Sequence, residues 1–259
     1  YNYNGEYKDV TKFTKNEMFE FRKKVQMVFQ DPYSALNPQK KIYTSFEEPL
    51  KTHGVSSVEE REKIMNRVLK MVNIQPDYLM RFPHEFSGGQ RQRLCIARAL
   101  EVTPEVLICD EPVSALDVSI QAQVLNLMKE IQKEMNLTYL FIAHDLSVVQ
   151  YMSDRIMVMY LGKIVEVADS KALYDEPLHP YTKALISAIP VADIHYKKKR
   201  QVLEGEVPSP IHKPSGCAFH NRCPYCMDIC KKEDPALRYH GADGHMTACH
   251  LYDGSEVNA

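Results

Sequence analysis

Two adjacent carboxylates, Asp110 and Glu111, end a short apolar run near the middle of the chain. The run, residues 106–109, reads VLIC and predicts a buried strand. A strand that delivers carboxylates to its carboxyl end places them in the crevice where open α/β sheets bind ligands. Because side chains alternate along a strand, we expect the two to serve different tasks. Asp110 suits Mg²⁺ held through water, and Glu111 suits a general base for an attacking water.

A glycine pair upstream supplies a candidate anion site. Residues 87–90, the signature segment, read Ser87-Gly88-Gly89-Gln90 and precede a basic helix. Two glycines allow a ligand to approach the backbone closely, and the free N–H groups at a helix N-terminus bind phosphate. The alternative interpretation is a glycine-containing turn capped by the Ser87 hydroxyl.

Two further polar residues follow predicted strands. Gln30 comes after VQMVF (residues 25–29), and Pro32 prevents that strand from continuing. The neutral side-chain amide of Gln30 can bind Mg²⁺ or hold a water molecule. His144 follows a third predicted strand, residues 139–143. Taken alone, either residue is typical of an ordinary protein surface.

The elements that position these residues alternate along the chain. Helices are expected from Ser57, from Ser87 and over residues 118–135, and two more strands over residues 155–160 and 163–167. Strands that alternate with helices predict an α/β fold with a parallel, doubly wound sheet. Composition changes after Pro190 toward Pro, Cys, His and Lys. We expect a core over residues 1–168, with a helical subdomain at about 42–102, and a C-terminal extension over residues 169–259.

Charge and hydropathy exclude some classes of protein. The formal net charge of −2 indicates no general attraction to nucleic acid, and the basic run at residues 197–200 is interpreted as a solvated linker. No apolar run approaches the roughly 20 residues that span a bilayer.

Taken together, residues 84–117 (HEFSGGQRQRLCIARALEVTPEVLICDEPVSALD) resemble the ATP-binding-cassette (ABC) ATPases. The resemblance implies a partial P-loop NTPase fold whose signature segment contacts a nucleotide held by a partner subunit. It also implies that Gln30 lies in a Q-loop, since VQMVFQDPYSALNP is similar to that loop, which touches the coupling helices of membrane subunits. His144 takes the place of the switch histidine, which contacts the γ-phosphate. Asp117, which closes Ser-Ala-Leu-Asp, takes that of the D-loop residue that communicates across the dimer.

One expected motif is missing from the sequence. No G-x-x-x-x-G-K-[ST] phosphate loop occurs in the 259 residues. Within the ABC resemblance this implies that the N-terminal phosphate-loop segment is lacking. We therefore expect that these residues alone are inactive and do not hold Mg-ATP in their own half-site, because the backbone cradle and its lysine are absent.

Three strings narrow the resemblance to oligopeptide/dipeptide importers. LHPYTKAL (residues 178–185), FQDPYSALNP and VMYLGKIVE are similar to that group, and more to the second of its two ATPase subunits. The resemblance implies ATP and Mg²⁺ as cofactors and a peripheral position on the cytoplasmic face of the membrane. It implies a second ATPase subunit, two transmembrane permease subunits and, indirectly, an extracellular peptide-binding protein as partners, with no nucleic acid. The transported substrate stays open.

Five cysteines crowd the C-terminal part, with the spacing C-x5-C-x2-C-x3-C-x18-C. Similar importer subunits have a pattern that matches Cys217, Cys223, Cys230 and Cys249, whereas Cys226 departs from it. Four thiolates can hold a [4Fe–4S] cluster or tetrahedral Zn²⁺. Free thiols or a disulfide stay open as alternatives. Cys95 and Cys109 are interpreted as core residues.

Two other classes of protein compete with the importer subunit. One is a non-catalytic remnant that binds only a partner ATPase or a metal, and the missing phosphate loop leaves this alternative open. The other is a soluble, non-transport ABC ATPase. Such proteins typically carry tandem cassettes or a coiled-coil insertion, and neither feature is found in the sequence.

Overall fold

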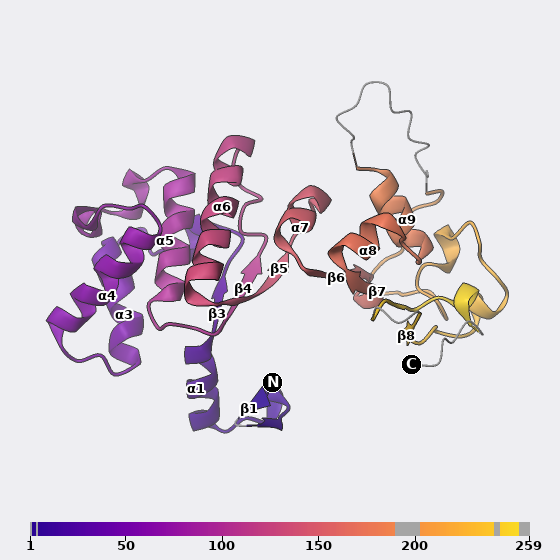
Figure 1. The fold of residues 1–259 in the computed structure, drawn as a ribbon, viewed down its shortest axis with the longest axis horizontal. Helices are drawn as coiled ribbons and strands as arrows, with labels where there is room; N and C mark the ends of the chain where they lie inside the picture. The colour runs from indigo at the N-terminus through magenta and orange to yellow at the C-terminus, as the bar shows by residue number, and fades with distance from the viewer. Residues whose placement is uncertain (1, 4, 190–202, 241–243, 254–259) are drawn as a thin grey trace. The chain divides into compact units, whose positions relative to one another are not determined.

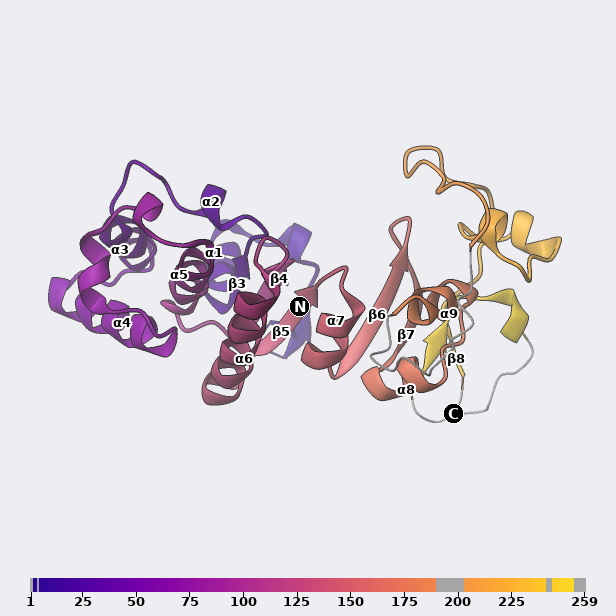
Figure 2. The same cartoon turned by 90° about the horizontal axis from the view of Figure 1, so that it is seen from above.

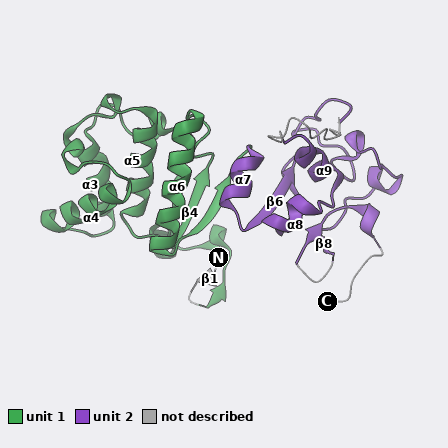
Figure 3. Ribbon diagram, turned by 45° about the horizontal axis from the view of Figure 1, so that its top comes forward, with its two compact units in different colours: residues 1–144 green, residues 145–259 purple. Residues whose placement is uncertain are grey.

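The computed structural model describes residues 2–3, 5–189, 203–240 and 244–253, and the basic run at 197–200 lies outside them. The chain forms two compact units, residues 1–144 and 145–259 (Figure 3). The core boundary expected after residue 168 stays a prediction; that residue lies inside a strand of unit 2. Among the described residues, no helix has both the length and the apolar character that crossing a membrane requires.

Unit 1 begins with a hairpin and a helix. Strands β1 (Asn2–Tyr3) and β2 (Glu6–Tyr7) pair antiparallel. After a 3-10 turn at Val10–Lys12 comes helix α1 (Lys15–Lys24). Thr14 and Glu17 form a capping box at its start, which satisfies two backbone N–H groups that have no partner inside the helix.

The centre of unit 1 is a three-stranded parallel sheet in the order β3-β4-β5. Its strands are β3 (Val25–Val28), β4 (Val106–Asp110) and β5 (Thr138–Ile142). Leu107 and Cys109 are fully buried on one face, whereas Met27 and Leu140, which share the other face by register, are exposed. All three strands run the same way, so their carboxyl ends meet at one edge of the sheet.

Helices cover the buried face and extend away from it. They are α2 (Pro32–Ala35), α3 (Ile42–Thr52), α4 (Val58–Met71), α5 (Gly88–Leu100) and α6 (Val118–Met135), with 3-10 turns at Pro76–Met80 and Pro83–Glu85. Figures 1 and 2 show α3 and α4 at one end of unit 1, with α5 between them and the sheet. Fully buried Phe46, Met65, Leu69 and Leu94 join α3, α4 and α5 in one apolar core.

Unit 2 is built around an antiparallel sheet in the order β6-β7-β9-β8. Its strands are β6 (Arg155–Tyr160), β7 (Lys163–Asp169), β8 (Arg238–Tyr239) and β9 (Met246–Thr247). Its helices are α7 (Leu146–Met152), α8 (Ser170–Asp175) and α9 (Pro180–Ser187), with 3-10 turns at His220–Arg222, Ile229–Lys231 and His250–Tyr252.

The parallel order predicted for the whole chain therefore holds for β3, β4 and β5, but not for β6 and β7. Those two strands are joined by only Leu161 and Gly162. Antiparallel strands can be joined by a two-residue turn, whereas parallel strands need a crossover of a dozen or more residues. Strand β9 adds to β7 through Glu166↔Thr247 and Val167↔Met246, so the C-terminal extension continues this sheet.

Candidate site for nucleotide hydrolysis

The Glu111 carboxylate lies between the other two predicted site residues at the carboxyl edge of the parallel sheet. Gln30 Nε2 donates to Glu111 Oε2 at 2.7 Å, across 81 positions of sequence. His144 Nδ1 lies 3.2 Å from Glu111 Oε1. The three residues follow β3, β4 and β5 in turn, so the parallel sheet brings them together. The side chain of His144 is 72% exposed and that of Glu111 25%, which leaves the carboxylate within reach of water.

Backbone geometry aims Glu111 away from the strand. Strand β4 ends at Asp110, and Glu111 has φ +44°, the left-handed region that a residue with a side chain adopts at a cost of roughly 1–3 kcal/mol. Its N–H donates to Ile142 O at 2.9 Å, and its carbonyl accepts from Ser114 N at 3.2 Å and Ser114 Oγ at 3.0 Å. The regular strand geometry therefore ends at Asp110 and does not continue through Glu111, whose left-handed backbone is held by these hydrogen bonds. Half-buried Asp110 stays in the ladder, paired with Ile142.

The signature segment opens helix α5. Ser87 is exposed and caps the helix: its Oγ accepts from Gln90 N at 3.3 Å, and its own N–H donates to Gln90 Oε1 at 3.0 Å. This reciprocal capping box accounts for Ser and Gln three residues apart. The capped-turn interpretation therefore describes the local structure, and it places Ser87 at the surface.

The second glycine of the signature segment is required by packing. A Cβ on Gly89 would lie 2.4 Å from Ile120 Cγ2 of α6, closer than real Cβ contacts come. A Cβ on Gly88 would lie 3.6 Å from Leu116 Cδ2 and 3.7 Å from the Tyr33 hydroxyl, in ordinary contact. The sequence interpretation explained both glycines by ligand approach; the structure adds close packing of α5 on α6 as the reason for Gly89.

Asp117, the expected D-loop residue, caps α6. Its Oδ1 accepts from Ile120 N at 3.0 Å, and its side chain is exposed. Because Ile120 also meets Gly89, the starts of α5 and α6 are in contact. The D-loop role of Asp117 stays a prediction.

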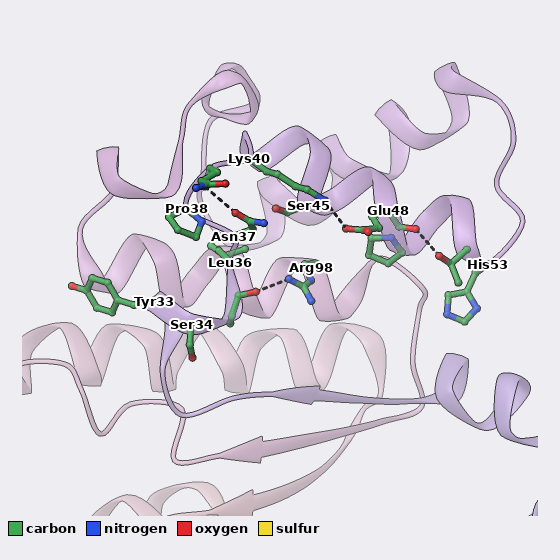
Figure 4. A pocket seen from close by; sticks show the side chains of 14 residues that line it. Tyr33, Ser34, Leu36, Asn37, Pro38, Lys40, Ser45, Glu48, His53 and Arg98 are labelled. Atoms are coloured by element: carbon green, nitrogen blue, oxygen red, sulfur yellow. Dashed lines mark hydrogen bonds and ion pairs between the residues drawn. The ribbon is translucent and has the colours of Figure 1, made fainter.

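A cavity of about 850 Å³ lies beside the Q-loop (Figure 4). Residues 33–40 and helix α3 line it, and Arg98 closes it from α5 by donating from Nη1 to Ala35 O at 2.8 Å. Gln30, Glu111 and His144 are not among its lining residues. The cavity is therefore separate from the carboxylate site, at the loop for which membrane-subunit contact is predicted.

In unit 2, the HPYT string is organised by a buried carboxylate that sequence reasoning missed. Glu166 has no exposed surface and accepts from Leu178 N at 2.7 Å, His179 N at 2.9 Å and His245 Nε2 at 2.7 Å. The sequence signal for this arrangement was slight, because its parts come from β7, from the segment before α9 and from the residue before β9.

His179 has a defined structural role as the cap of α9. Its Nδ1 accepts from Tyr181 N at 3.1 Å, and Pro180 occupies the first helical position. Burial, with a smaller contribution from the charge of Lys183, lowers the pKa of His179 to about 4. The ring is therefore neutral at pH 7, as an acceptor at Nδ1 requires.

The cysteine prediction receives no support from the structure. Within the described parts of the chain, no group of three or more His, Cys, Asp or Glu side chains is arranged to hold a metal ion, and Cys217, Cys223, Cys226, Cys230 and Cys249 are free thiols. Cys217 N does donate to Cys230 O at 2.8 Å, so these two backbones are neighbours. Burial, with smaller contributions from nearby Cys223, Cys217 and Cys230, raises the pKa of Cys249 to about 11, and a hydrogen bond from the backbone of Leu251 opposes the rise. The described residues therefore give no support to an iron–sulfur cluster or a zinc site, and metal ligation stays a prediction.

Comparison with known families matches both units. Residues 3–114 match the ABC transporter family, and residues 165–230 match the C-terminal region of oligopeptide/dipeptide transporters. The chain is also similar to the solved structure of cbiO1 from Clostridium perfringens, part of the ABC transporter complex cbiONQ. The TM-score is 0.56 at 28% identity, covering 63% of this chain and 64% of that one.

Curated relatives are more similar still. The oligopeptide transport ATP-binding protein AppF of Bacillus subtilis is 55% identical over 89% of this chain and 70% of its own length. The putative oligopeptide transport ATP-binding protein YkfD of the same organism is 51% identical over 94% of this chain and 75% of its own length. The di/tripeptide transport ATP-binding protein DppF of Pseudomonas aeruginosa is 47% identical over 92% of this chain and 73% of its own length.

The fold and these matches define the class as the ATP-binding subunits of ABC transporters, which confirms the family predicted from the signature segment. Within that class, the chain belongs to the oligopeptide/dipeptide importer family.

Proposed function

We propose that the chain is an ATP-binding and hydrolysing subunit that energises the import of oligopeptides or dipeptides. The observation that carries the proposal is the Glu111 carboxylate held between Gln30 Nε2 and His144 Nδ1 at the carboxyl edge of the sheet. The cargo is taken from the relatives, which are named for oligopeptide and di/tripeptide transport.

Each residue at this edge has a distinct task in the proposal. Glu111 accepts a proton from the attacking water, while Gln30 and His144 fix the orientation of its carboxylate. Asp110 and the Gln30 amide are oxygen donors of the kind that Mg²⁺ prefers, and one or two carboxylates suffice because substrate phosphates and waters complete its shell. When bound, Mg²⁺ neutralises charge that develops on the transferred phosphoryl group.

The signature segment serves a nucleotide held by another subunit. Exposed Ser87, the glycines after it and the N-terminal dipole of α5 offer hydroxyl, amide and positive potential to a γ-phosphate, and Gln90 braces Ser87. Asp117, at the start of α6, acts as the D-loop residue that couples the two nucleotide sites across the same dimer. A second ATPase subunit is therefore the proposed direct partner.

Two transmembrane permease subunits and, through them, an extracellular peptide-binding protein complete the proposed assembly. The chain is placed as a peripheral subunit on the cytoplasmic face of the membrane. Support comes from the transporter names of the relatives and from the cavity beside the Q-loop.

The absent phosphate-loop string limits what these 259 residues do by themselves. Since no G-x-x-x-x-G-K-[ST] occurs among them, we expect no micromolar Mg-ATP binding by this polypeptide alone. Isothermal titration measures this directly. Micromolar affinity in the isolated chain contradicts the expectation.

The experiment for the proposed function uses the assembled transporter with its partner ATPase and permease subunits. We expect MgATP hydrolysis coupled to peptide uptake, and accumulation of an ATP-bound dimer in the Glu111→Gln variant. An assembled wild type that neither hydrolyses ATP nor takes up peptide contradicts the proposal and favours the non-catalytic remnant. Hydrolysis without any association with permease subunits favours the soluble, non-transport class.

The C-terminal thiols need a separate measurement, because metal ligation here stays a prediction without structural support. Ligation requires thiolates, and burial raises the pKa of Cys217, Cys223 and Cys249, so binding must release protons and rearrange the segment. Elemental analysis for iron and zinc after anaerobic purification decides between the alternatives. If wild-type protein contains neither iron nor zinc, the free-thiol alternative holds. If one of the metals is found, the Cys223→Ser variant is the matched sample and should contain less of it.

A further inference from the structure

Tyr33 joins the Q-loop to the signature segment. It lies in α2, three residues after Gln30, and its ring packs against Arg91 of α5 with the guanidinium carbon 4.1 Å from the ring centroid. Its hydroxyl lies 3.7 Å from where a Cβ on Gly88 would be. One aromatic side chain thus contacts the first turn of the helix that the signature segment opens.

The contact is one of three along a single face of α5. Cys95 lies under α2, with its Sγ 4.0 Å from Pro32 O, and Arg98 Nη1 donates to Ala35 O at 2.8 Å. Positions 91, 95 and 98 recur at helical spacing and so share one face. Both ends of helix α2 are therefore held on α5, and Tyr33 makes the contact that lies nearest the signature segment.

The same side chain also borders the cavity beside the Q-loop. Tyr33 and Arg98 both line that cavity, and Tyr33 remains 56% exposed (Figure 4). A partner that occupies the cavity and displaces α2 therefore also disturbs the contacts of α2 with Arg91 and Arg98. Because α5 is a rigid element with a packed apolar side, displacement at its surface passes to its N-terminus rather than dissipating locally.

Arg91 is an unusual residue for its position. It lies in the first turns of α5, where a cation opposes the helix dipole, and its Nε is buried without a hydrogen-bond partner among the described residues. The face of the Tyr33 ring is the favourable environment that offsets both costs, since aromatic faces attract guanidinium groups. The two side chains are thus expected to act as a unit.

We propose that Tyr33 and Arg91 form a positioning pair that fixes the signature segment relative to the Q-loop, so that movement of the Q-loop resets the nucleotide-contacting turn. Neither residue contacts the reacting atoms; both act through residues 87–90. The expected effect of the pair on ATP hydrolysis rests on the proposed function. The expected effect of the pair on the position of residues 87–90 does not.

The first experiment therefore reads the signature segment without activity. Hydrogen exchange by mass spectrometry on the whole chain compares wild type with Tyr33→Leu, Tyr33→Phe and Arg91→Gln. Tyr33→Leu and Arg91→Gln are expected to speed exchange in the peptides that cover residues 87–91, and Tyr33→Phe to leave it unchanged because the ring remains. Tyr7→Leu, at a tyrosine that is 88% exposed on β2, is the matched control and is expected to have no effect.

The second experiment measures ATP hydrolysis by the assembled transporter, with and without peptide-loaded binding protein. Tyr33→Leu and Arg91→Gln are expected to lower the peptide-stimulated kcat by about 2- to 30-fold, with KM for ATP little changed. The double variant is expected to be no worse than either single variant, because residues that act as a unit are not additive.

The outcomes separate this proposal from the proposed function. Unchanged exchange in Tyr33→Leu, or Tyr33→Phe as damaging as Tyr33→Leu, overturns the positioning pair whatever the activity. Fully additive losses in the double variant also overturn it. Faster exchange in an assembly whose wild type hydrolyses no ATP supports the pair as a structural link and contradicts the proposed function alone.

Discussion

Glu111 in unit 1 and Glu166 in unit 2 each lie against a histidine, but in opposite surroundings. Each carboxylate is close to a histidine nitrogen, at 3.2 Å for His144 and 2.7 Å for His245. Glu111 keeps a quarter of its side-chain surface exposed beside an open histidine, whereas Glu166 has none and also accepts from two backbone N–H groups.

The difference shows that a carboxylate–histidine contact alone does not identify a reactive site. A carboxylate that takes a proton from water must be reached by water, and only Glu111 is. A fully enclosed carboxylate whose donors come from two segments outside its own strand instead fixes the three segments relative to one another. The same amide substitution at the two positions should therefore change different properties.

The largest expected effect is on catalysis at Glu111. In the assembled transporter, Glu111→Gln should lower kcat for ATP hydrolysis by about 10²–10⁴-fold, since the amide cannot accept the proton from water. Because the side chain is partly exposed, its free energy of unfolding in urea should change by less than about 0.5 kcal/mol. Turnover equal to that of wild type would remove Glu111 from the role of general base.

The next effect is on stability at Glu166. Glu166→Gln puts an NH₂ group among N–H donors in a buried place, and should lower the free energy of unfolding by about 3 kcal/mol. Urea unfolding followed by circular dichroism measures the loss, with Glu111→Gln as the chemically matched control. Equal stability of the two variants would abolish the contrast between the two carboxylates.

A third carboxylate, Glu101, sharpens the comparison because it is buried without partners. It is 2% exposed, neither of its oxygens has a hydrogen-bond partner among the described residues, and burial raises its pKa to about 9, with Arg98 opposing the shift. A raised folded-state pKa gives stability that is complete below the unfolded value of about 4.5 and is lost as pH rises toward 9.

Glu101→Gln should therefore stabilise unit 1 by as much as about 3 kcal/mol at pH 7 and much less near pH 4.5. Thermal unfolding of the variant and wild type across this pH range checks the result. A variant that is less stable than wild type at pH 7 would show that the Glu101 carboxylate has a partner in solution.

The smallest effect concerns His179, the cap beside Glu166. Its folded-state pKa of about 4 lies below the ordinary value of 6.5, so its contribution is complete above pH 6.5 and is lost as pH falls toward 4. His179→Asn keeps a side chain that caps helices well but does not titrate. Between pH 7 and 5.5 wild type should lose about 1 kcal/mol more than the variant. If the free energies of unfolding of wild type and His179→Asn in urea changed equally with pH, the lowered pKa assigned to His179 would be contradicted.

Local signals were sufficient for several elements. Helix α6 runs over residues 118–135 as predicted, because Asp117 caps it and an amphipathic pattern continues to its end. Strand β6 likewise has its predicted bounds. The family followed from the resemblance of residues 84–117, and Gln30 and His144 were placed at the ends of predicted strands, which parallel pairing brings to one edge.

Other features left little local trace. The two-residue strands β8 and β9 are too short for any periodicity, and Glu166 meets His245 across 79 positions. Gly89 looked like a ligand-contacting residue because nothing in its own segment reveals Ile120 against it. The cysteine spacing predicted a metal site, but spacing does not fix how thiols are oriented, and the described thiols are not arranged as ligands.

The sequence by itself determined the class of protein and the parallel direction of β3, β4 and β5, because these depend on motifs and on the alternation of strands with helices. Only the tertiary structure decided that Glu111 leaves its strand through a left-handed backbone, that Glu166 is enclosed and that Tyr33 lies on Arg91. Burial and long-range contact arise when distant segments pack, and no single segment carries that information.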